Sequence, residues 1–276
     1  RMTGAEMVVK TLEKNGVKVV FGYPGAANCP IIDKLSFSSI KHILTRNEQG
    51  AAHMASGYAR VTKQAGVCTA TSGPGATNLI TGIATAYMDS IPMVALTGQV
   101  ATKLIGKDAF QEVDITGATL PFTKHSYLIK DGLDIPRVVN EAFHIANTGR
   151  PGPVLIDFPM DLLKKEFDYP DEDEDVNIRG YKLMGKANES QVKKVAEAIK
   201  GAKKPVILAG GGVVISDATN EFRKFVKETD IPVVSTMMGI GILPSDNPRY
   251  YGMIGSHGVK SCLLYTSPSP RDTERS

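Results

Sequence analysis

Short apolar segments alternate with segments of helical periodicity over residues 1–162, and this alternation constrains the fold more than any other feature of the chain. The segments predicted as strands are residues 17–21, 40–44, 67–71, 93–97, 126–129 and 154–158. A helix is predicted at 4–15, after a capping box of Thr3 and Glu6, and others at 30–35 and 136–147. Two further helices are predicted between them, one that starts at Glu48 and one that follows the turn at 72–78 and ends at about residue 87. The alternation predicts an α/β fold with a doubly wound, mostly parallel sheet.

Four distinctive stretches directly follow predicted strands. They are residues 22–27, the carboxylate Glu48, residues 73–78 and residues 98–111. Ligands of such sheets bind beyond the carboxyl ends of the strands. We therefore expect the four stretches to meet at one edge of the sheet.

Glu48 opens a helix that is rich in small residues. Its alanines recur at a spacing of four, which predicts a flat face for close packing, formed by Ala51, Ala55 and Ala59. A neighbouring apolar stripe is predicted to point into the core, formed by Met54, Tyr58 and Val61. A carboxylate at a helix start is often only a partner of the helix dipole. One that lies among residues that exclude water is also suited to holding a proton.

The glycine-rich turns and the histidines are ambiguous by themselves. Residues 72–78 lack the Gly-Lys-Ser/Thr of a nucleotide P-loop, and a tight turn between packed backbones explains them as well. The turn of Gly210, Gly211 and Gly212 fits either a dinucleotide-binding loop or a simple connection. The five histidines show no metal-ligand spacing, so no metal site is predicted within this chain.

Composition argues against several classes of protein. A net charge of +3 with scattered basic residues argues against nucleic-acid binding. Three cysteines without CxxC spacing argue against a disulfide framework or a zinc site and favour a reducing, cytoplasmic compartment. No apolar run reaches the length of a membrane span and no signal peptide is recognisable, so we expect no membrane association.

The second half of the chain starts with a change in character. Residues 163–189 include an acidic run and are predicted to be a solvated linker. The strand and helix pattern restarts in residues 190–261, with helices at 191–199 and 218–227 and strands at 206–208 and 233–235, as at the start of a second, incomplete α/β domain. Residues 262–276 lose all periodicity, and we expect a disordered, non-native tail on a fragment of a longer protein.

From residue 2 to about residue 261 the chain resembles the large, catalytic subunits of the acetolactate synthase (acetohydroxyacid synthase) family, which are thiamine-diphosphate enzymes. The resemblance rests on segments in matching order and spacing: 21–26 (Phe-Gly-Tyr-Pro-Gly-Ala), 43–53 with Arg-Asn-Glu-Gln-Gly-Ala-Ala-His, 71–78 with Ser-Gly-Pro-Gly-Ala-Thr-Asn, 97–100, 108–112, 123–125, 149–154 and 238–241. It implies that residues 1–162 are a pyrimidine-binding domain and that residues 190–261 start a central, FAD-binding domain.

The resemblance also implies roles for single residues. Glu48 would hydrogen-bond the N1′ nitrogen of the cofactor's aminopyrimidine ring and so promote loss of the thiazolium C2 proton. Gly25 and Gln111 would complete the catalytic set, and Phe110 and Lys124 would line the substrate pocket. Further contacts to thiamine diphosphate would come from Pro24, Ala26, Gly73 and Asn78.

FAD is implied in a structural role, with contacts from Arg150, Gly210, Gly211, Gly212, Thr236, Met237, Met238 and His257. No Gly-Asp-Gly followed by a distant Asn occurs in the chain, so Mg²⁺ and the diphosphate would be bound by a carboxyl-terminal domain outside it. The expected partners are 2-keto acids, further copies of the subunit in a homodimer or homotetramer, and a regulatory small subunit.

The implied reaction condenses pyruvate with pyruvate or 2-ketobutyrate, with loss of CO₂, in branched-chain amino-acid biosynthesis. The fragment alone is expected to be inactive. Alternatives within the superfamily are a 2-keto-acid decarboxylase, a pyruvate oxidase, or a relative that acts on sulfoacetaldehyde or oxalyl-CoA. Pyruvate decarboxylases carry adjacent histidines near residues 110–111 and glyoxylate carboligase lacks the glutamate, and this chain matches neither pattern. A non-catalytic flavin- or nucleotide-binding module is the alternative from another class.

Overall fold

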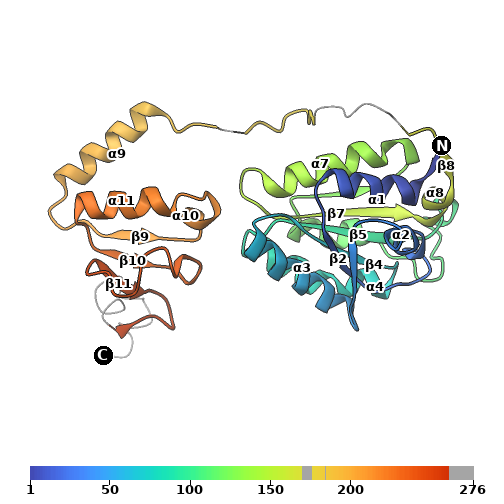
Figure 1. Cartoon of the computed structure of the whole chain (residues 1–276), viewed down its shortest axis with the longest axis horizontal. Coiled ribbons are helices and arrows are strands. Elements are labelled where there is room, and N and C mark those ends of the chain that lie inside the picture. The colour runs from blue at the N-terminus through green and yellow to red at the C-terminus, as the bar shows by residue number, and fades with distance from the viewer. Residues whose placement is uncertain (170–175, 184, 261–276) are drawn as a thin grey trace. The chain divides into compact units, whose positions relative to one another are not determined.

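The computed structural model describes residues 1–169, 176–183 and 185–260, and it divides the chain into two compact units, Arg1–Met184 and Gly185–Ser276 (Figure 1). Residues 170–175 of the predicted linker and the predicted tail at 262–276 lie outside the described residues.

Unit 1 contains a parallel sheet of six strands in the order β3-β2-β4-β5-β7-β6. The strands are β2 (Val19–Gly22), β3 (Lys41–Leu44), β4 (Gly66–Ala70), β5 (Met93–Gln99), β6 (His125–Leu128) and β7 (Pro153–Pro159). All six predicted strands are present, and the predicted doubly wound, parallel α/β fold is confirmed.

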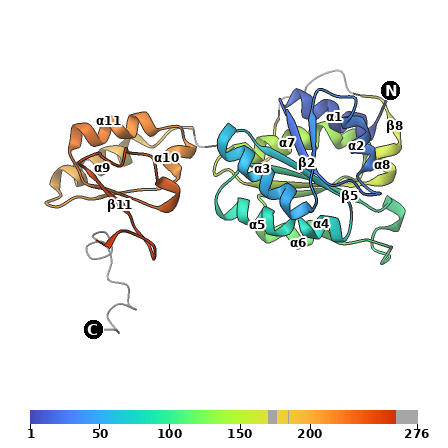
Figure 2. The same cartoon turned by 60° about the horizontal axis from the view of Figure 1, so that its bottom comes forward.

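Helices cover both faces of this sheet, as Figures 1 and 2 show. One face carries α1 (Gly4–Lys14), α2 (Cys29–Leu35) and α7 (Ile135–Asn147). The other carries α3 (Glu48–Thr62), α4 (Pro74–Asn78), α5 (Ile80–Met88) and α6 (Ile115–Thr119). The predicted capping box of α1 is present, because Thr3 Oγ1 accepts from the Glu6 N–H at 3.2 Å and Glu6 Oε2 accepts from the Thr3 N–H at 2.8 Å.

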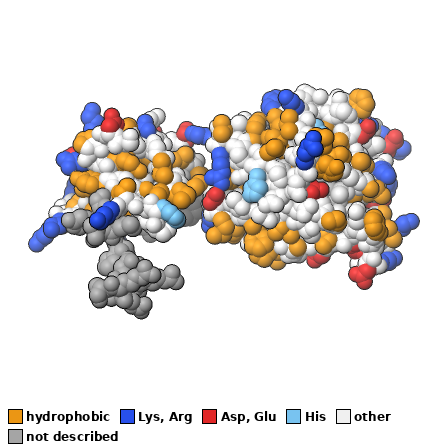
Figure 3. All heavy atoms as spheres, turned by 90° about the horizontal axis from the view of Figure 1, so that it is seen from below, with side chains coloured by type: hydrophobic (Ala, Val, Ile, Leu, Met, Phe, Trp, Pro, Cys, Tyr) orange, Lys and Arg blue, Asp and Glu red, His pale blue; other side chains and the backbone are white. Residues whose placement is uncertain are grey.

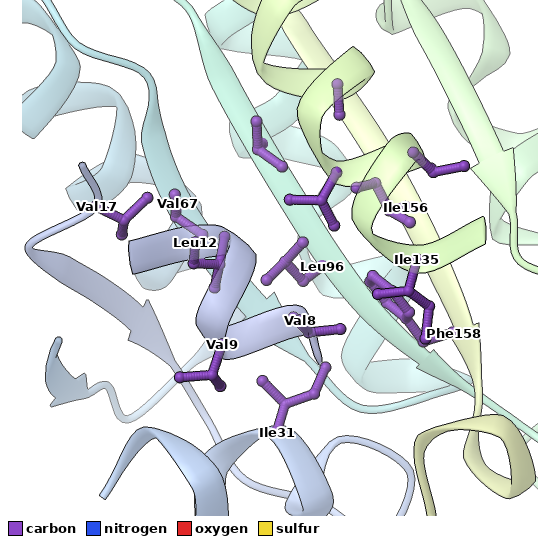
Figure 4. Packing of buried hydrophobic residues seen from close by; sticks show 14 of the residues in the cluster. Val8, Val9, Leu12, Val17, Ile31, Val67, Leu96, Ile135, Ile156 and Phe158 are labelled. Atoms are coloured by element: carbon purple, nitrogen blue, oxygen red, sulfur yellow. The ribbon is translucent and has the colours of Figure 1, made fainter. Parts of the chain in front are cut away.

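The first face is packed with branched and aromatic side chains (Figure 4). Strand residues of alternate positions point into it, which is the period of two expected for a pleated sheet. The strand residues, such as Val67, Leu96, Ile156 and Phe158, interdigitate with helix residues of α1, α2 and α7, such as Val8, Leu12, Ile31 and Ile135.

The second face is packed mainly with small side chains. The buried residues of α3 are Ala51, Ala52, Ala55, Ser56 and Ala59, as the spacing of the alanines predicts. Two glycines let the backbones approach closely. A Cβ atom on Gly66 would lie 2.0 Å from the Ala55 carbonyl oxygen, and one on Gly82 would lie 2.3 Å from the Ala52 Cβ atom.

The predicted apolar stripe of α3 does not point into this core. Met54 is 49% exposed and Val61 is 85% exposed, while the partly buried Tyr58 ring packs edge-on against Phe21 at 6.1 Å. The prediction was wrong because the alanine face, not the larger side chains, is the one that fits against β4 and α5. Figure 3 shows hydrophobic side chains exposed in several patches on the side of unit 1 seen from below in Figure 1.

The start of the predicted linker belongs to unit 1. α8 (Met160–Lys164) leads into β8 (Glu166–Phe167), which pairs antiparallel with β1 (Met2–Thr3). Tyr169 packs beneath Lys10, whose Nζ lies 4.0 Å from the ring centroid. The aromatic side chains of Phe167, Tyr169 and Tyr181 are anchored on unit 1, so the described parts of 163–183 are not a free linker.

Unit 2 contains a parallel three-stranded sheet with the order β11-β10-β9. Its strands are β9 (Ile207–Ala209), β10 (Val233–Ser235) and β11 (Tyr250–Met253), and its helices are α9 (Glu189–Gly201), α10 (Gly212–Ile215) and α11 (Thr219–Thr229). The predicted helices and strands are all present. Three elements of the described part of unit 2 were not predicted, namely α10, β11 and the 3-10 helix Met237–Gly239.

We predict opposite effects for two Gly→Ala substitutions in neighbouring helices of unit 1. In Gly82→Ala the new Cβ collides with Ala52, which should destabilise the chain by about 1–3 kcal/mol because the core is overpacked. In Gly57→Ala of α3 the new Cβ meets nothing within 4 Å, so the higher helix propensity of Ala should stabilise the chain by about 0.5–1 kcal/mol. Urea unfolding followed by circular dichroism measures both changes. Shifts in the same direction would contradict this packing.

Candidate functional site

The turn after β2 is held by a fully buried asparagine, Asn28. Asn28 Oδ1 accepts from the Gly25 N–H at 2.7 Å, and Asn28 Nδ2 donates to the Tyr23 carbonyl at 3.1 Å. Because both polar atoms of the amide are used within the turn, the backbone conformation is fixed. This fixes the turn that contains Pro24, Gly25 and Ala26.

Thr71 lies between this turn and the glycine turn that follows β4. A Cβ atom on Gly25 would lie 2.5 Å from the Thr71 Cβ atom, and one on Gly75 would lie 2.7 Å from Thr71 Cγ2. Thr71 Oγ1 also accepts from the Ala27 N–H at 3.1 Å. Sequence analysis did not single out Thr71, although its position directly between a strand and a glycine turn was the available signal.

Glu48 is the first residue of α3, and Asn47 caps this helix by accepting from the Gln49 N–H at 2.7 Å. Glu48 Oε2 accepts from Asn78 Nδ2 at 3.0 Å. Glu48 Oε1 would lie 3.3 Å from a Cβ atom on Gly75, and none of the described residues donates a hydrogen bond to it. Glu48 is only partly buried in this chain. Asn78 holds its Oε2 atom, and Oε1 is available to accept a hydrogen bond from a ligand.

The loop after β5 closes against the glycine turn. Gly73 adopts φ +61°, a conformation that favours glycine, and a Cβ atom there would lie 2.7 Å from the Gln111 carbonyl oxygen. Gln111 itself adopts φ +57°. The neighbouring Phe110 is 88% exposed. The structure therefore gathers the residues predicted for this edge, namely Glu48, Pro24, Gly25, Ala26, Gly73, Asn78, Phe110 and Gln111.

Lys124 does not lie at this edge. It precedes β6, so it is at the opposite, amino edge of the parallel sheet. Its Nζ donates to the Thr148 carbonyl at 2.6 Å, and also to the Ile145 carbonyl, at the end of α7. This placement corrects the expectation that Lys124 lines the same pocket as Phe110, because its ammonium group is already used to hold the end of a helix.

Arg150 also lies at the amino edge, before β7. Arg150 Nε donates to Ser90 Oγ at 2.7 Å, and Nη2 donates to the carbonyls of Tyr87 and Met88 at 3.2 and 3.3 Å. Within unit 1 the guanidinium group therefore holds the end of α5, away from Glu48.

The carboxylate of Asp157 is buried in the centre of unit 1, where the residue is 1% exposed. Asp157 Oδ1 accepts from Thr97 Oγ1 at 2.6 Å, and Oδ2 accepts from Gln99 Nε2 at 2.8 Å. Burial raises the pKa of Asp157 to about 7, against the opposing effect of these two hydrogen bonds, and the charge of Asp114 adds to the increase. Sequence analysis missed this network because three residues on two strands form it only in the folded sheet.

In unit 2 the segments predicted to bind FAD meet at the carboxyl ends of β9 and β10. A Cβ atom on Gly211 would lie 2.9 Å from the Met238 Cβ atom, and the Thr236 N–H donates to the Ala209 carbonyl at 3.0 Å. His257 follows β11, which ends at the same edge. The structure thus brings together Gly210, Gly211 and Gly212 with Thr236, Met237 and Met238, and places the exposed His257 on a neighbouring loop.

No group of three or more His, Cys, Asp or Glu in the described ranges could hold a metal ion. No helix in those ranges has the length and apolar character needed to cross a membrane.

Comparison with known proteins identifies both units. The model of the thiamine pyrophosphate enzyme N-terminal TPP binding domain matches residues 2–118, and that of the thiamine pyrophosphate enzyme central domain matches residues 192–266. The chain is 53% identical over 263 residues to a probable acetolactate synthase large subunit of Methanocaldococcus jannaschii, with 94% of this chain and 44% of that protein covered. It is 52% identical over 266 residues to an acetolactate synthase of Mycobacterium bovis, with 95% and 43% covered.

A third relative is an acetolactate synthase large subunit of Corynebacterium glutamicum, 48% identical over 266 residues, with 95% of this chain and 42% of that protein covered. The chain therefore spans less than half the length of these relatives. The similarity nevertheless runs through both units, and it includes the edge that carries Glu48.

We predict a pH dependence of stability that is specific to Asp157. Its folded pKa is about 7 and its ordinary value is 3.8, so from about pH 4 to pH 7 the unfolded chain has lost a proton that the native chain keeps. Raising the pH through this range should therefore lower the free energy of unfolding, by up to roughly 1.4 kcal/mol per pH unit, with no further loss above about pH 7.

Asp157→Asn should remove this loss because an amide does not titrate in this range, and its amide can still donate to Thr97 Oγ1 and accept from Gln99. The measurement is urea unfolding of parent and variant across this pH range. Circular dichroism monitors the unfolding, because the chain has no Trp whose fluorescence could report it. The difference between parent and variant isolates Asp157 from the other titrating groups. A difference that does not change with pH would contradict the assignment.

Proposed function

The chain belongs to the thiamine pyrophosphate enzyme family, and on that premise we propose that it is part of an acetolactate synthase large subunit. The proposed reaction condenses two 2-keto acids, pyruvate with pyruvate or with 2-ketobutyrate, and releases CO₂, as the first common step of branched-chain amino-acid biosynthesis. The observation that carries the proposal is the Glu48 carboxylate, held by Asn78 at 3.0 Å beside two glycine turns in a chain about 50% identical to such subunits.

The residues at the carboxyl edge fit the aminopyrimidine end of thiamine diphosphate. Gly25, Gly73 and Gly75 let the turns beside Glu48 pack closely, because a Cβ atom on any of them would meet atoms of Thr71 or Gln111 at 2.5–2.7 Å, and this packing fixes the turns around the proposed ring position. One carboxylate oxygen, Glu48 Oε1, has no donor among the described residues. When bound, the cofactor supplies the electron sink that allows a 2-keto acid to lose CO₂.

The proposed role of Glu48 is to hold a proton at the N1′ nitrogen of the aminopyrimidine. Asn78 donates to Oε2 and therefore leaves Oε1 to face the ring. Asn47 caps α3 and fixes the helix turn on which Glu48 lies. A single carboxylate serves this role because a second one nearby would compete for the same proton.

The proposed role of the loop after β5 is to bind the second 2-keto acid. Gln111 offers an amide for the carboxylate or keto oxygen, and Phe110 offers an apolar wall that excludes water. Phe110 is 88% exposed in the chain by itself, so we propose that another copy of the subunit covers it in a homodimer or homotetramer. A regulatory small subunit is proposed because two of the relatives are named large subunits.

We propose that Mg²⁺ and the diphosphate are bound by a carboxyl-terminal region of the complete subunit. The relatives extend beyond the part that matches this chain, which leaves room for such a region. FAD is proposed to bind at the edge of unit 2 formed by residues 210–212 and 236–238, with His257 as a further contact. The close packing of Gly211 on Met238, where a Cβ atom would lie at 2.9 Å from the Met238 Cβ atom, holds these two segments side by side at one edge, which supports a shared binding site there.

FAD binding can be tested with this chain. Titration with FAD should quench flavin fluorescence, and Gly211→Val should weaken the binding by about tenfold or more because its side chain would displace Met238 from this edge. Gly201→Val, at the end of α9 where a Cβ atom meets nothing within 4 Å, is the matched control and should leave the affinity unchanged. No binding by the parent chain would contradict the proposed FAD site.

The catalytic proposal is tested in the complete subunit with pyruvate, thiamine diphosphate and Mg²⁺. The expected products are acetolactate and CO₂ in equal amounts, from two molecules of pyruvate. Release of acetaldehyde would indicate a decarboxylase, and acetyl phosphate with hydrogen peroxide would indicate a pyruvate oxidase.

Glu48→Gln should lower the rate of acetolactate formation and of cofactor C2–H exchange by on the order of 100-fold or more. Glu189→Gln is the matched control. Glu189 is also the first residue of a helix, α9, and it also follows a capping asparagine, Asn188. It should leave both rates within about twofold, because the helix-dipole contribution of such a residue is small. Equal effects of the two substitutions would sink the assignment of Glu48.

A further inference from the structure

The loop that carries Phe110 and Gln111 runs from the end of β5 to the start of α6 and contains no strand. It includes two non-glycine residues with positive φ, Asp108 at +51° and Gln111 at +57°. Non-glycine residues adopt this conformation only when the surrounding structure holds them there. The contacts that hold the loop therefore decide where Phe110 and Gln111 lie.

The far end of the loop is tied to the centre of the sheet through Gln99. Gln99 Nε2 donates to Asp157 Oδ2 at 2.8 Å and to the Val113 carbonyl at 2.9 Å, and Gln99 Oε1 accepts from the Val100 N–H at 2.9 Å. Nε2 faces two acceptors and Oε1 faces one N–H donor, so a flipped amide would lose all three hydrogen bonds and only one orientation fits. Gln99 thereby joins the two ends of the loop to a carboxylate in β7.

Asp157 cannot rotate away from this contact. Its second oxygen accepts from Thr97 Oγ1 at 2.6 Å, and Thr97 is the register partner of Asp157 in the neighbouring strand. The residue is 1% exposed, so water cannot replace Gln99 as the donor. Asp157 is thus a fixed point within the sheet, and Gln99 transmits that position to the loop.

Two further carboxylates hold the rest of the loop. At its start, Asp161 accepts from the Thr102 N–H at 2.9 Å and from Thr102 Oγ1 at 2.6 Å. At its tip, Glu112 accepts from the Ala109 N–H at 2.8 Å and from the Gly106 N–H. Both of these lie nearer the surface than Asp157, and neither reaches the far end of the loop at Val113.

We propose that Gln99, held by the buried carboxylate of Asp157, is the positioning residue of the loop that carries Phe110 and Gln111, and so sets recognition of the second 2-keto acid without touching it. The role in recognition rests on the proposed function. The role in holding the loop does not, and it can be tested separately.

The first test is hydrogen exchange of this chain. Gln99→Met keeps the length of the side chain but removes the bonds to Asp157, Val113 and Val100. It should raise the exchange rates of the protected loop amides of Leu104, Lys107 and Glu112 by about tenfold, with smaller changes in the centre of the sheet.

Thr97→Val is the matched control, because it also removes a donor from Asp157, and the Thr97 hydroxyl donates to Asp157 and not to the loop. Its loop amides should exchange within about twofold of the parent. Unchanged loop exchange in Gln99→Met, or an equal increase across the whole of unit 1 in both variants, would overturn the positioning role.

The second test uses the complete subunit. Gln99→Met should raise the KM for the second 2-keto acid by about tenfold while C2–H exchange of the bound cofactor stays within about twofold of the parent, because Glu48 and Asn78 are unaffected. A parent that forms no acetolactate would refute the proposed function but leave the exchange result standing. A loosened loop with an unchanged KM would overturn the role in recognition alone.

Discussion

The carboxyl edge of the first sheet depends on the close approach of backbone to backbone, which is possible only where Cβ atoms are absent. A Cβ atom on Gly22 would lie 2.4 Å from Thr69 Cγ2, and one on Gly98 would lie 2.5 Å from the Ala27 carbonyl carbon. Thr71 fills the space left between Gly25 and Gly75. Because these turns support one another, each one fixes the position of the next. The conformation of this edge therefore depends on glycines as much as on the side chains that pack there.

Three carboxylates of unit 1 differ in protonation and in exposure because their surroundings differ. Asp157 is fully buried and accepts from two side chains, and burial raises its pKa to about 7. Glu112 lies at a loop tip, where backbone N–H groups, first that of Ala109, hold its pKa below the ordinary value. Glu48 is partly exposed, with a donor on only one oxygen. Of the three, only Glu48 combines a fixed position with a free face, as a residue that holds a proton for a ligand requires.

Sequence predicted the order of strands and helices in unit 1 because each element has its own local signal, such as the capping box of Thr3 and Glu6 or the glycine after a strand. It predicted the gathering of Glu48 and the glycine turns because strand ends in parallel sheets share an edge. It did not predict the exposed side of α3, since the alanines and the larger residues Met54 and Val61 were both plausible core faces. Only the partner surface, with Gly66 and Gly82, decides between them.

Two pairs of residues with the same local pattern show why the site itself needs tertiary structure. Asn47–Glu48 and Asn188–Glu189 each place a capping asparagine before a glutamate at the first helical position, so sequence and helix dipole treat them alike. Glu189 is exposed, and no described residue of another element donates to its carboxylate. Glu48 faces Asn78 and Gly75, which are brought to it by β4 and not by its own helix. The chemistry proposed for Glu48 therefore comes from the strand order of the sheet, which sets its neighbours.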